Sequence, residues 1–276
     1  MYESLVLASE TVLSAYPILI KKVDATLGLQ TGVRMFAFAG LAAAAAAVTG
    51  APLTLTGSLA PGLLNLLHVG ASYTAFEALP AGNAMALFYT YPVWNVLGAA
   101  VAFGESVDWS RAPWMLLALV GALLVAKPAV TSWSMWGIVA ALIAALTETG
   151  IYLWFRKEAT EDSQPWTNMF RMYGSSGVLW AILAVLGVVG IGQIRGSSMA
   201  AMLLFNGLVG FVGYAMRFFA VPQVGTLVFS TLSFFGVVSA YLFGWLFVGE
   251  VPTAVQTCGA ALIIAANAFL IRRETV

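Results

Sequence analysis

Two glutamates, Glu10 and Glu148, are the residues of this sequence best placed to do chemistry. Each lies in an apolar stretch: Glu10 is 11 residues before Lys21, and Glu148 is 8 residues before Arg156. At helical rise, each carboxyl group lies about 12–16 Å from its helix end, near the middle of a bilayer. An ionised carboxylate there costs about 3 kcal/mol. We therefore expect both glutamates to bind a ligand or to exchange protons with the aqueous phases.

The alternative is a structural role for these glutamates, as partners of arginines in the apolar stretches. Arg34 or Arg171 could pair with them, because a buried carboxylate needs a partner. Both arginines, however, lie only a few residues inside their apolar stretches and could extend to the membrane interface. We expect a structural role for both.

The stretch 60–79 has the most polar lining. Asn65, His68 and Ser72 share one helical face, and Tyr73 and Glu77 share the adjacent one. We expect His68, Tyr73 and Glu77 to line a substrate pocket. The alternatives are a hydrogen-bonded packing role for the histidine and a solvated position for the glutamate.

Deep aromatic residues complete the predicted pocket. Their rings could stack on an aromatic substrate or attract its ammonium group. The predicted wall of the pocket consists of the aromatic residues Tyr73, Phe76, Tyr89, Tyr91, Trp94, Trp154 and Tyr214, together with the polar residue Asn95. Pro17 and Pro92 interrupt two apolar stretches and are the predicted hinges, because proline removes a helical hydrogen bond.

The elements that carry these residues must cross a membrane. Of 276 residues, 61% are hydrophobic and 9% are charged, which excludes a soluble domain. Apolar runs long enough to span lie near 4–21, 30–48, 60–79, 81–103, 112–127, 133–155, 167–191, 198–219, 223–248 and 252–271. The fold class is therefore an all-α membrane protein with ten transmembrane helices.

Charge and cysteine content limit the possible partners. Twelve Lys and Arg balance twelve Asp and Glu, so no nucleic-acid partner is expected. One cysteine, Cys258, and one histidine, His68, exclude a disulfide framework and a metal site built from several such ligands. We expect no cofactor and no enzyme activity, with a small-molecule substrate and the lipid bilayer as partners.

The two halves of the chain repeat each other. Ser9-Glu10-Thr11 matches Thr147-Glu148-Thr149, Arg34-Met35-Phe36 matches Arg171-Met172-Tyr173, Gly82 matches Gly225, and Gly104-Glu105 matches Gly249-Glu250. The offsets lie near half the chain length, which predicts five-helix repeats at 1–130 and 131–276. Because five is odd, the second repeat enters the membrane from the opposite side, as in many secondary transporters.

The placement of basic residues sets the expected orientation. Seven of the twelve fall on one side of the predicted topology: Arg111, Arg156, Lys157, Arg171, Arg217, Arg272 and Arg273. Basic residues favour the cytoplasmic side, so both termini are predicted to be cytoplasmic.

This pattern resembles the EamA family of the drug/metabolite transporter superfamily. The resemblance rests on the five-plus-five arrangement and on two stretches, Pro80–Glu105 and Pro222–Glu250, each closed by Gly-Glu. It implies a gradient-driven exporter of small metabolites in the bacterial inner membrane that works by alternating access. Exporters of amino acids, including aromatic ones, are prominent members, and we expect a monomer to function.

The first apolar stretch also resembles the first helix of the small multidrug resistance family. That family uses a membrane glutamate for protons or cationic drugs, and Glu10 with Glu148 would supply its pair within one chain. Arg217, three residues after Tyr214, departs from the pattern because it replaces an aromatic residue. A cation beside the site would work against cationic substrates, so we expect Arg217 to belong to the site and to decide substrate preference. A proton-coupled carrier of organic cations or quaternary amines is therefore the alternative to an amino-acid exporter.

Overall fold

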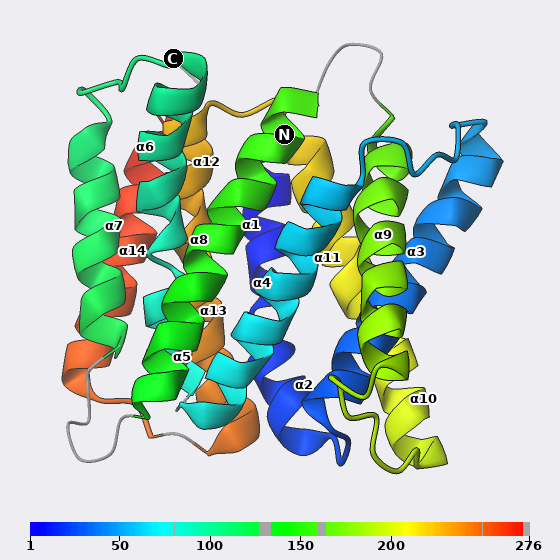
Figure 1. Cartoon of the computed structure of the whole chain (residues 1–276). Helices are drawn as coiled ribbons and strands as arrows, with labels where there is room; N and C mark the ends of the chain where they lie inside the picture. Colours follow the sequence, from blue (N-terminus) through cyan, green and yellow to red (C-terminus); the bar gives the residue numbers. More distant parts are fainter. Residues whose placement is uncertain (80, 127–133, 159–163, 250, 273–276) are drawn as a thin grey trace.

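The computed structural model describes residues 1–79, 81–126, 134–158, 164–249 and 251–272. Every regular element among them is helical, and both chain ends lie at the same end of the bundle (Figure 1). The helices are α1 (Tyr2–Leu13), α2 (Tyr16–Lys22), α3 (Leu27–Thr49), α4 (Leu59–Ala78), α5 (Ala81–Phe88), α6 (Tyr91–Phe103), α7 (Ala112–Ala126), α8 (Met135–Glu158), α9 (Pro165–Val185), α10 (Gly196–Phe205), α11 (Phe211–Ala220), α12 (Thr226–Ser233), α13 (Phe235–Phe243) and α14 (Ala254–Arg272). The π-helical turns η1 (Asn206–Gly210) and η2 (Gly244–Val248) follow α10 and α13.

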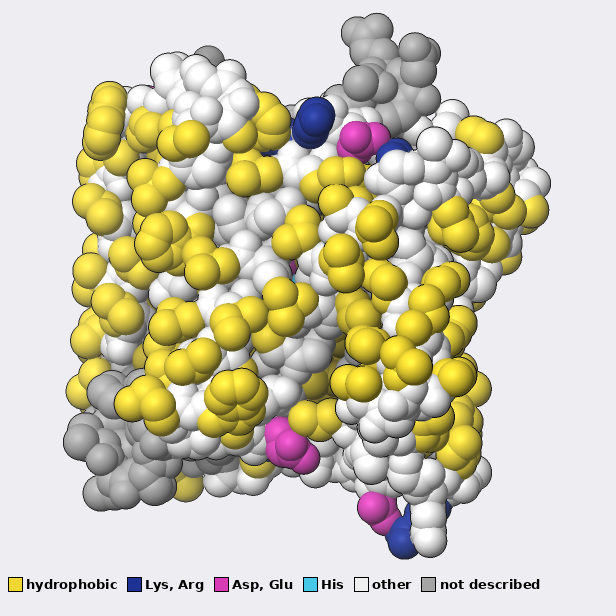
Figure 2. Space-filling model, viewed as in Figure 1, with side chains coloured by type: hydrophobic (Ala, Val, Ile, Leu, Met, Phe, Trp, Pro, Cys, Tyr) yellow, Lys and Arg dark blue, Asp and Glu magenta, His cyan; other side chains and the backbone are white. Residues whose placement is uncertain are grey.

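Seven helical segments are long and apolar enough to cross a bilayer: 2–22, 27–49, 83–103, 135–158, 196–220, 226–248 and 254–272. The apolar helix α7 is shorter, at 15 residues. The remaining predicted spans correspond to α4 and α9, of 20 and 21 residues. Hydrophobic side chains cover the visible face between charged groups at the two ends (Figure 2). The all-helical class is confirmed, while the count of ten spans stays a prediction.

Three predicted spans are broken inside the bundle. The first divides between Leu13 and Tyr16, just before Pro17, and the fourth divides between Phe88 and Tyr91, just before Pro92. Proline has no N–H to donate, so each break lies where a helical hydrogen bond is missing. The ninth divides at Phe234 without a proline.

The core lies where the two halves of the chain meet. Helix α3 packs on α9, α4 packs on α8, and α1 packs on α11. Helix α7 packs on α14, where Gly121 and Gly259 face each other. Small residues let the two backbones approach closely, as is common in membrane bundles.

The Gly121 contact gives a test of this packing. A Cβ at Gly121 would lie 2.6 Å from the Gly259 carbonyl oxygen, which is backbone and cannot rotate away. We expect Gly121→Ala to destabilise the fold by about 1–3 kcal/mol, measured by thermal unfolding in detergent micelles. The matched control is Gly40→Ala, because a Cβ at that exposed position in α3 meets no atom within 4 Å. Equal melting temperatures for the two variants would contradict close packing of α7 on α14.

Candidate functional site

A buried ion-pair cluster occupies the junction of the two halves. Arg217 on α11 donates from Nη1 to Glu148 Oε1 on α8 over 2.6 Å. Its Nε lies 3.9 Å from Glu10 Oε1 on α1. The three side chains are 5%, 2% and 1% exposed, so each charge depends on the others rather than on water. One arginine therefore serves the two repeated glutamates.

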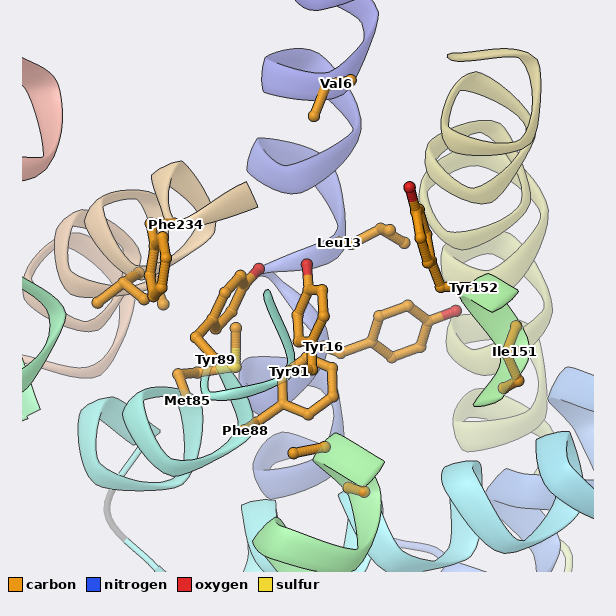
Figure 3. Close-up of a cluster of buried hydrophobic side chains, with 14 of the residues drawn as sticks. Val6, Leu13, Tyr16, Met85, Phe88, Tyr89, Tyr91, Ile151, Tyr152 and Phe234 are labelled. Atoms are coloured by element: carbon orange, nitrogen blue, oxygen red, sulfur yellow. The ribbon is translucent and has the colours of Figure 1, made fainter. Parts of the chain in front are cut away.

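Two tyrosines at the α5–α6 break hold the Glu10 carboxylate. Tyr89 donates its hydroxyl to Oε2 over 2.8 Å, and Tyr91 donates to Oε1 over 3.2 Å. Their rings lie side by side with a centroid separation of 5.4 Å (Figure 3). A Cβ at Gly236 on α13 would overlap the Tyr89 ring, so this glycine provides the room for it. The helix break thus turns two tyrosines toward one carboxylate.

His68 on α4 lies against the other glutamate. Its Nε2 is 3.2 Å from Glu148 Oε2, and its Nδ1 is 3.1 Å from the Ala144 carbonyl oxygen. A carbonyl only accepts, so Nδ1 carries a hydrogen. The Nε2–carboxylate contact is then favourable only when a proton lies on the imidazole or on Glu148. Oε2 of Glu148 makes no hydrogen bond to a described residue, so the contact is an ion pair only when the imidazole carries a second proton.

A second buried arginine, Arg34, lies inside a cage of aromatic rings. Its Cζ is 4.5 Å from the centroid of Tyr16, 4.8 Å from that of Tyr214, 5.4 Å from that of Phe38 and 5.8 Å from that of Tyr73. The residue is 2% exposed, so the expectation that Arg34 reaches the membrane interface is wrong. Among the described ion pairs, Glu10 and Glu148 use Arg217 and His68 rather than Arg34 or Arg171.

These groups surround one small enclosed cavity of about 30 Å³, enough for about one water molecule. Its lining contains Glu10, Leu13, Tyr16, Arg34, His68, Ser72, Phe76, Met85, Phe88, Tyr89, Tyr214 and Arg217. Carboxylate, guanidinium and aromatic groups thus face the same space.

The predicted pocket residues divide into three sets. His68, Phe76, Tyr89, Tyr214 and both acid–base partners Glu10 and Arg217 line the cavity. Tyr73, Tyr91 and Glu148 are buried beside it through the contacts given above.

The other predicted pocket residues lie elsewhere. Glu77 is exposed on α4, and Trp94 is 42% exposed on α6. Trp154 packs on Phe155 and under the Arg171 guanidinium, away from the cavity lining. Asn95 is fully buried on α6, and its amide atoms have no partner among the described residues.

Sequence reasoning missed Tyr16 and Arg34 as site residues. Tyr16 donates its hydroxyl to Asn206 Oδ1 over 2.9 Å and faces the Arg34 guanidinium. Tyr16 precedes the predicted hinge Pro17, and Arg34 belongs to the repeated Arg-Met-aromatic triplet, so both carried a local signal. Their contact depends on how α2 and α3 pack, which the spacing of residues in the sequence does not predict.

A second polar cluster lies near the end of the bundle that holds both termini. Glu105 accepts from Arg156 Nε over 2.6 Å and from Thr226 Oγ1 over 2.7 Å. Arg156 also donates to the carbonyls of Val221 and Val224. These bonds tie the end of α6 to α8 and α12. Glu250, the matching residue of the second repeat, lies outside the described residues.

Comparisons with known proteins agree with this helical arrangement. The EamA-like transporter family matches residues 135–272. The pseudopaline exporter of Pseudomonas aeruginosa is 25% identical over 78% of this chain and 75% of that protein. A probable terminal-alkyne amino-acid exporter of Streptantibioticus cattleyicolor is 27% identical over 99% of this chain and 93% of its own. A riboflavin transporter of Rhizobium johnstonii is 27% identical over 77% of this chain and 68% of its own. One solved crystal structure, 17% identical, aligns with a TM-score of 0.77 over 97% of this chain and 96% of that one, which shows a shared fold.

The central ion pair predicts a large stability difference between two arginines. Arg217→Gln leaves Glu148 buried without a cation, so we expect a loss of about 3–5 kcal/mol in the free energy of unfolding. Arg195→Gln, which breaks an exposed pair with Asp24, should change it by less than about 1 kcal/mol. Chemical or thermal unfolding in micelles measures both. Similar losses in the two variants would show that Arg217 does not hold the cluster together.

Proposed function

Because this chain belongs to the EamA-like transporter family, we propose that it is a secondary active transporter that exports amino acids or similar small metabolites across the plasma membrane by alternating access. Aromatic and other neutral amino acids are the favoured substrates. The family and the relatives are transporters rather than enzymes. Together with the seven apolar helical segments, they make the chain an integral membrane protein.

One observation carries the choice of substrate: the enclosed cavity is lined by both a carboxylate and guanidinium groups among aromatic rings. An amino acid carries an ammonium and a carboxylate on one carbon, and a neutral one adds an apolar side chain. A carboxylate and guanidinium groups that line one cavity complement such a zwitterion, and the rings complement its side chain. The probable amino-acid exporter among the relatives supports the same class.

The alternative substrate class, organic cations, receives less support. Two buried arginines lie at the site, and Arg217 already engages the glutamates that a cation would need. A cation entering this cavity would meet like charge in a medium of low dielectric constant.

The contact between His68 and Glu148 supports coupling to protons. A proton between His68 Nε2 and Glu148 Oε2 removes the repulsion between these two acceptors. When the proton leaves, the two atoms repel each other again. Movement of the surrounding helices would therefore change the affinity for the proton, as an exchanger requires.

The helix contacts support the ten-span inverted repeat of 1–130 and 131–276. In such a repeat, span three (α4) corresponds to span eight (α10 and α11), and span six (α8) corresponds to span one (α1 and α2). The contact of α4 with α8 then has its counterpart in the contact of α11 with α1, and both contacts occur. The α5–α7 and α12–α14 contacts correspond in the same way. We propose this topology with cytoplasmic termini and a functional monomer. Arg34 and Arg217 are buried inside the bundle, so we leave them out of the charge count that sets the orientation.

Transport in proteoliposomes tests the proposed activity. We expect wild-type protein to accumulate L-phenylalanine against its gradient under an imposed pH difference, and an uncoupler to abolish the accumulation. Glu10→Gln and Glu148→Gln should reduce it to the level of protein-free liposomes, because neither amide can take up a proton in this range. Glu77→Gln, an exposed glutamate of α4, is the matched control. Undiminished proton-driven transport in both site variants would end the coupling proposal, and transport of cations alone would favour the alternative substrate.

Cysteine labelling tests the topology. In a Cys258→Ser background, which contains no other cysteine, we place single cysteines at Leu53, Trp109 and Ile194, all exposed in loops. A membrane-impermeant maleimide added to intact cells should label Ile194→Cys and spare Leu53→Cys and Trp109→Cys until the cells are opened. The reverse pattern would place the termini outside, and labelling of all three from outside would contradict the membrane topology.

A further inference from the structure

Arg34 is a buried cation that has no anionic partner among the described residues. Its Nε and Nη2 groups make no hydrogen bond to any described residue, although the side chain lines the central cavity. A buried charge is normally paired, because removal from water costs several kcal/mol per ion. The two nearby carboxylates have other partners. Glu10 accepts from Tyr89 and Tyr91 and lies 3.9 Å from Arg217. Glu148 pairs with Arg217 through Oε1, while its Oε2 lies 3.2 Å from His68 Nε2 and makes no hydrogen bond to a described residue.

The aromatic cage compensates only part of this cost. The rings of Tyr16 and Tyr214, with Cζ distances of 4.5 and 4.8 Å, can attract the guanidinium through their faces. Hydrogen-bond donors of a guanidinium lie in its plane, where a ring face supplies no lone pair. The cage therefore stabilises the charge and leaves donors free for an acceptor.

The repeated counterpart of Arg34 shows what a satisfied arginine looks like in this fold. Arg171, in the matching triplet of the second half, donates to Glu158 over 2.8 Å, to Asn168 and to the carbonyl oxygens of Thr56 and Gly57. The two halves thus place an arginine at the same repeat position. Arg171 donates to carboxylate, amide and carbonyl oxygens, whereas the Nε and Nη2 groups of Arg34 have no acceptor among the described residues. This difference indicates that Arg34 donates its hydrogen bonds to a ligand that enters the site.

Hydroxyl groups nearby also lack partners. Tyr73, whose ring contacts Arg34, and Tyr173, which packs on Phe38 and Tyr214, have buried hydroxyls without a hydrogen bond to any described residue. Guanidinium N–H and phenol O–H groups are both donors to an anionic oxygen. A planar carboxylate suits this set best, because it can accept two parallel bonds from one guanidinium.

We propose that Arg34, inside the cage of Tyr16, Tyr73 and Tyr214, binds the carboxylate of the transported molecule. This rests on the proposed transport function and deepens it, since it assigns the anionic group of the substrate to α3. Arg217 then has a different task, to neutralise Glu10 and Glu148. The present cavity admits about one water, so the helices must separate before a substrate reaches Arg34.

The test uses three probes that differ in one charged group each: L-phenylalanine, L-phenylalaninamide and 3-phenylpropionate. Apparent dissociation constants come from ligand-induced shifts of the unfolding temperature of the purified full chain in lipid nanodiscs. For the wild type we expect L-phenylalaninamide to bind about 10- to 100-fold more weakly than L-phenylalanine, as loss of a charge-assisted pair implies. This comparison needs no variant and is independent of folding defects.

Variants then locate the effect. Arg34→Gln should lower the affinity for L-phenylalanine and 3-phenylpropionate by about 10- to 100-fold and leave L-phenylalaninamide unchanged. Arg34→Lys, which retains the charge but not the two-pronged geometry, should retain part of the affinity and serves where the glutamine variant fails to fold. Arg171→Gln is the matched control, because it removes the same group from the other half and should leave the ratios between the probes unchanged.

The outcomes separate this proposal from the proposed function. Transport of L-phenylalanine with equal binding of its amide, or with unchanged ratios in Arg34→Gln, would overturn the carboxylate site while the transport function stands, and would assign the unpaired donors to water. Arg34-dependent binding of 3-phenylpropionate without transport of any amino acid would support the carboxylate site and overturn the amino-acid function. Absence of binding by every carboxylate probe to the wild type would overturn the carboxylate site.

Discussion

The cost of a buried charge is the constraint on which the rest of this structure depends. Two carboxylates and two guanidiniums lie in the core of a bundle whose visible face is largely apolar, and each of these residues is at most 4% exposed. The shared ion pairs of Arg217 meet this constraint for Glu10 and Glu148. Because the three side chains come from α1, α8 and α11, neutralisation also requires that the two halves of the chain meet at this point. Electrostatics and packing therefore select the same arrangement.

Irregular helices make that meeting possible. A continuous helix presents side chains at fixed angles, so Tyr89 and Tyr91, two residues apart, would point to nearly opposite sides. The break between α5 and α6 brings both hydroxyls to Glu10. The break before Pro17 likewise places Tyr16 against Arg34. In a membrane such breaks are tolerated where they face protein interior rather than lipid, and both of these do.

Much of the fold and part of the site followed from the sequence. Composition and apolar run lengths predict the helical class, and the central depth of Glu10 and Glu148 predicts their burial, because both depend only on local rise and bilayer thickness. The partner of the glutamates does not follow: Arg34 and Arg171 were the expected candidates from position, while Arg217 is the residue that arrives there by tertiary packing. Trp94 was predicted to line the pocket but is exposed. Its aromatic character alone does not tell which face of the helix meets lipid.

The internal duplication explains both the symmetry of the site and its departure from symmetry. Repetition supplies a glutamate from each half, but a pair of unmatched carboxylates at one point would repel each other in a medium of low dielectric constant. A cation in one half only resolves this, and Arg217 lies closer to Glu148, at 2.6 Å, than to Glu10, at 3.9 Å. The hydroxyls of Tyr89 and Tyr91 support the carboxylate that receives less of the arginine, and His68 supports the other. Each glutamate thus has a second partner besides Arg217. A shift of α1 relative to α8 would change the distances from Arg217 to Glu10 and to Glu148, and each carboxylate would still keep its second partner.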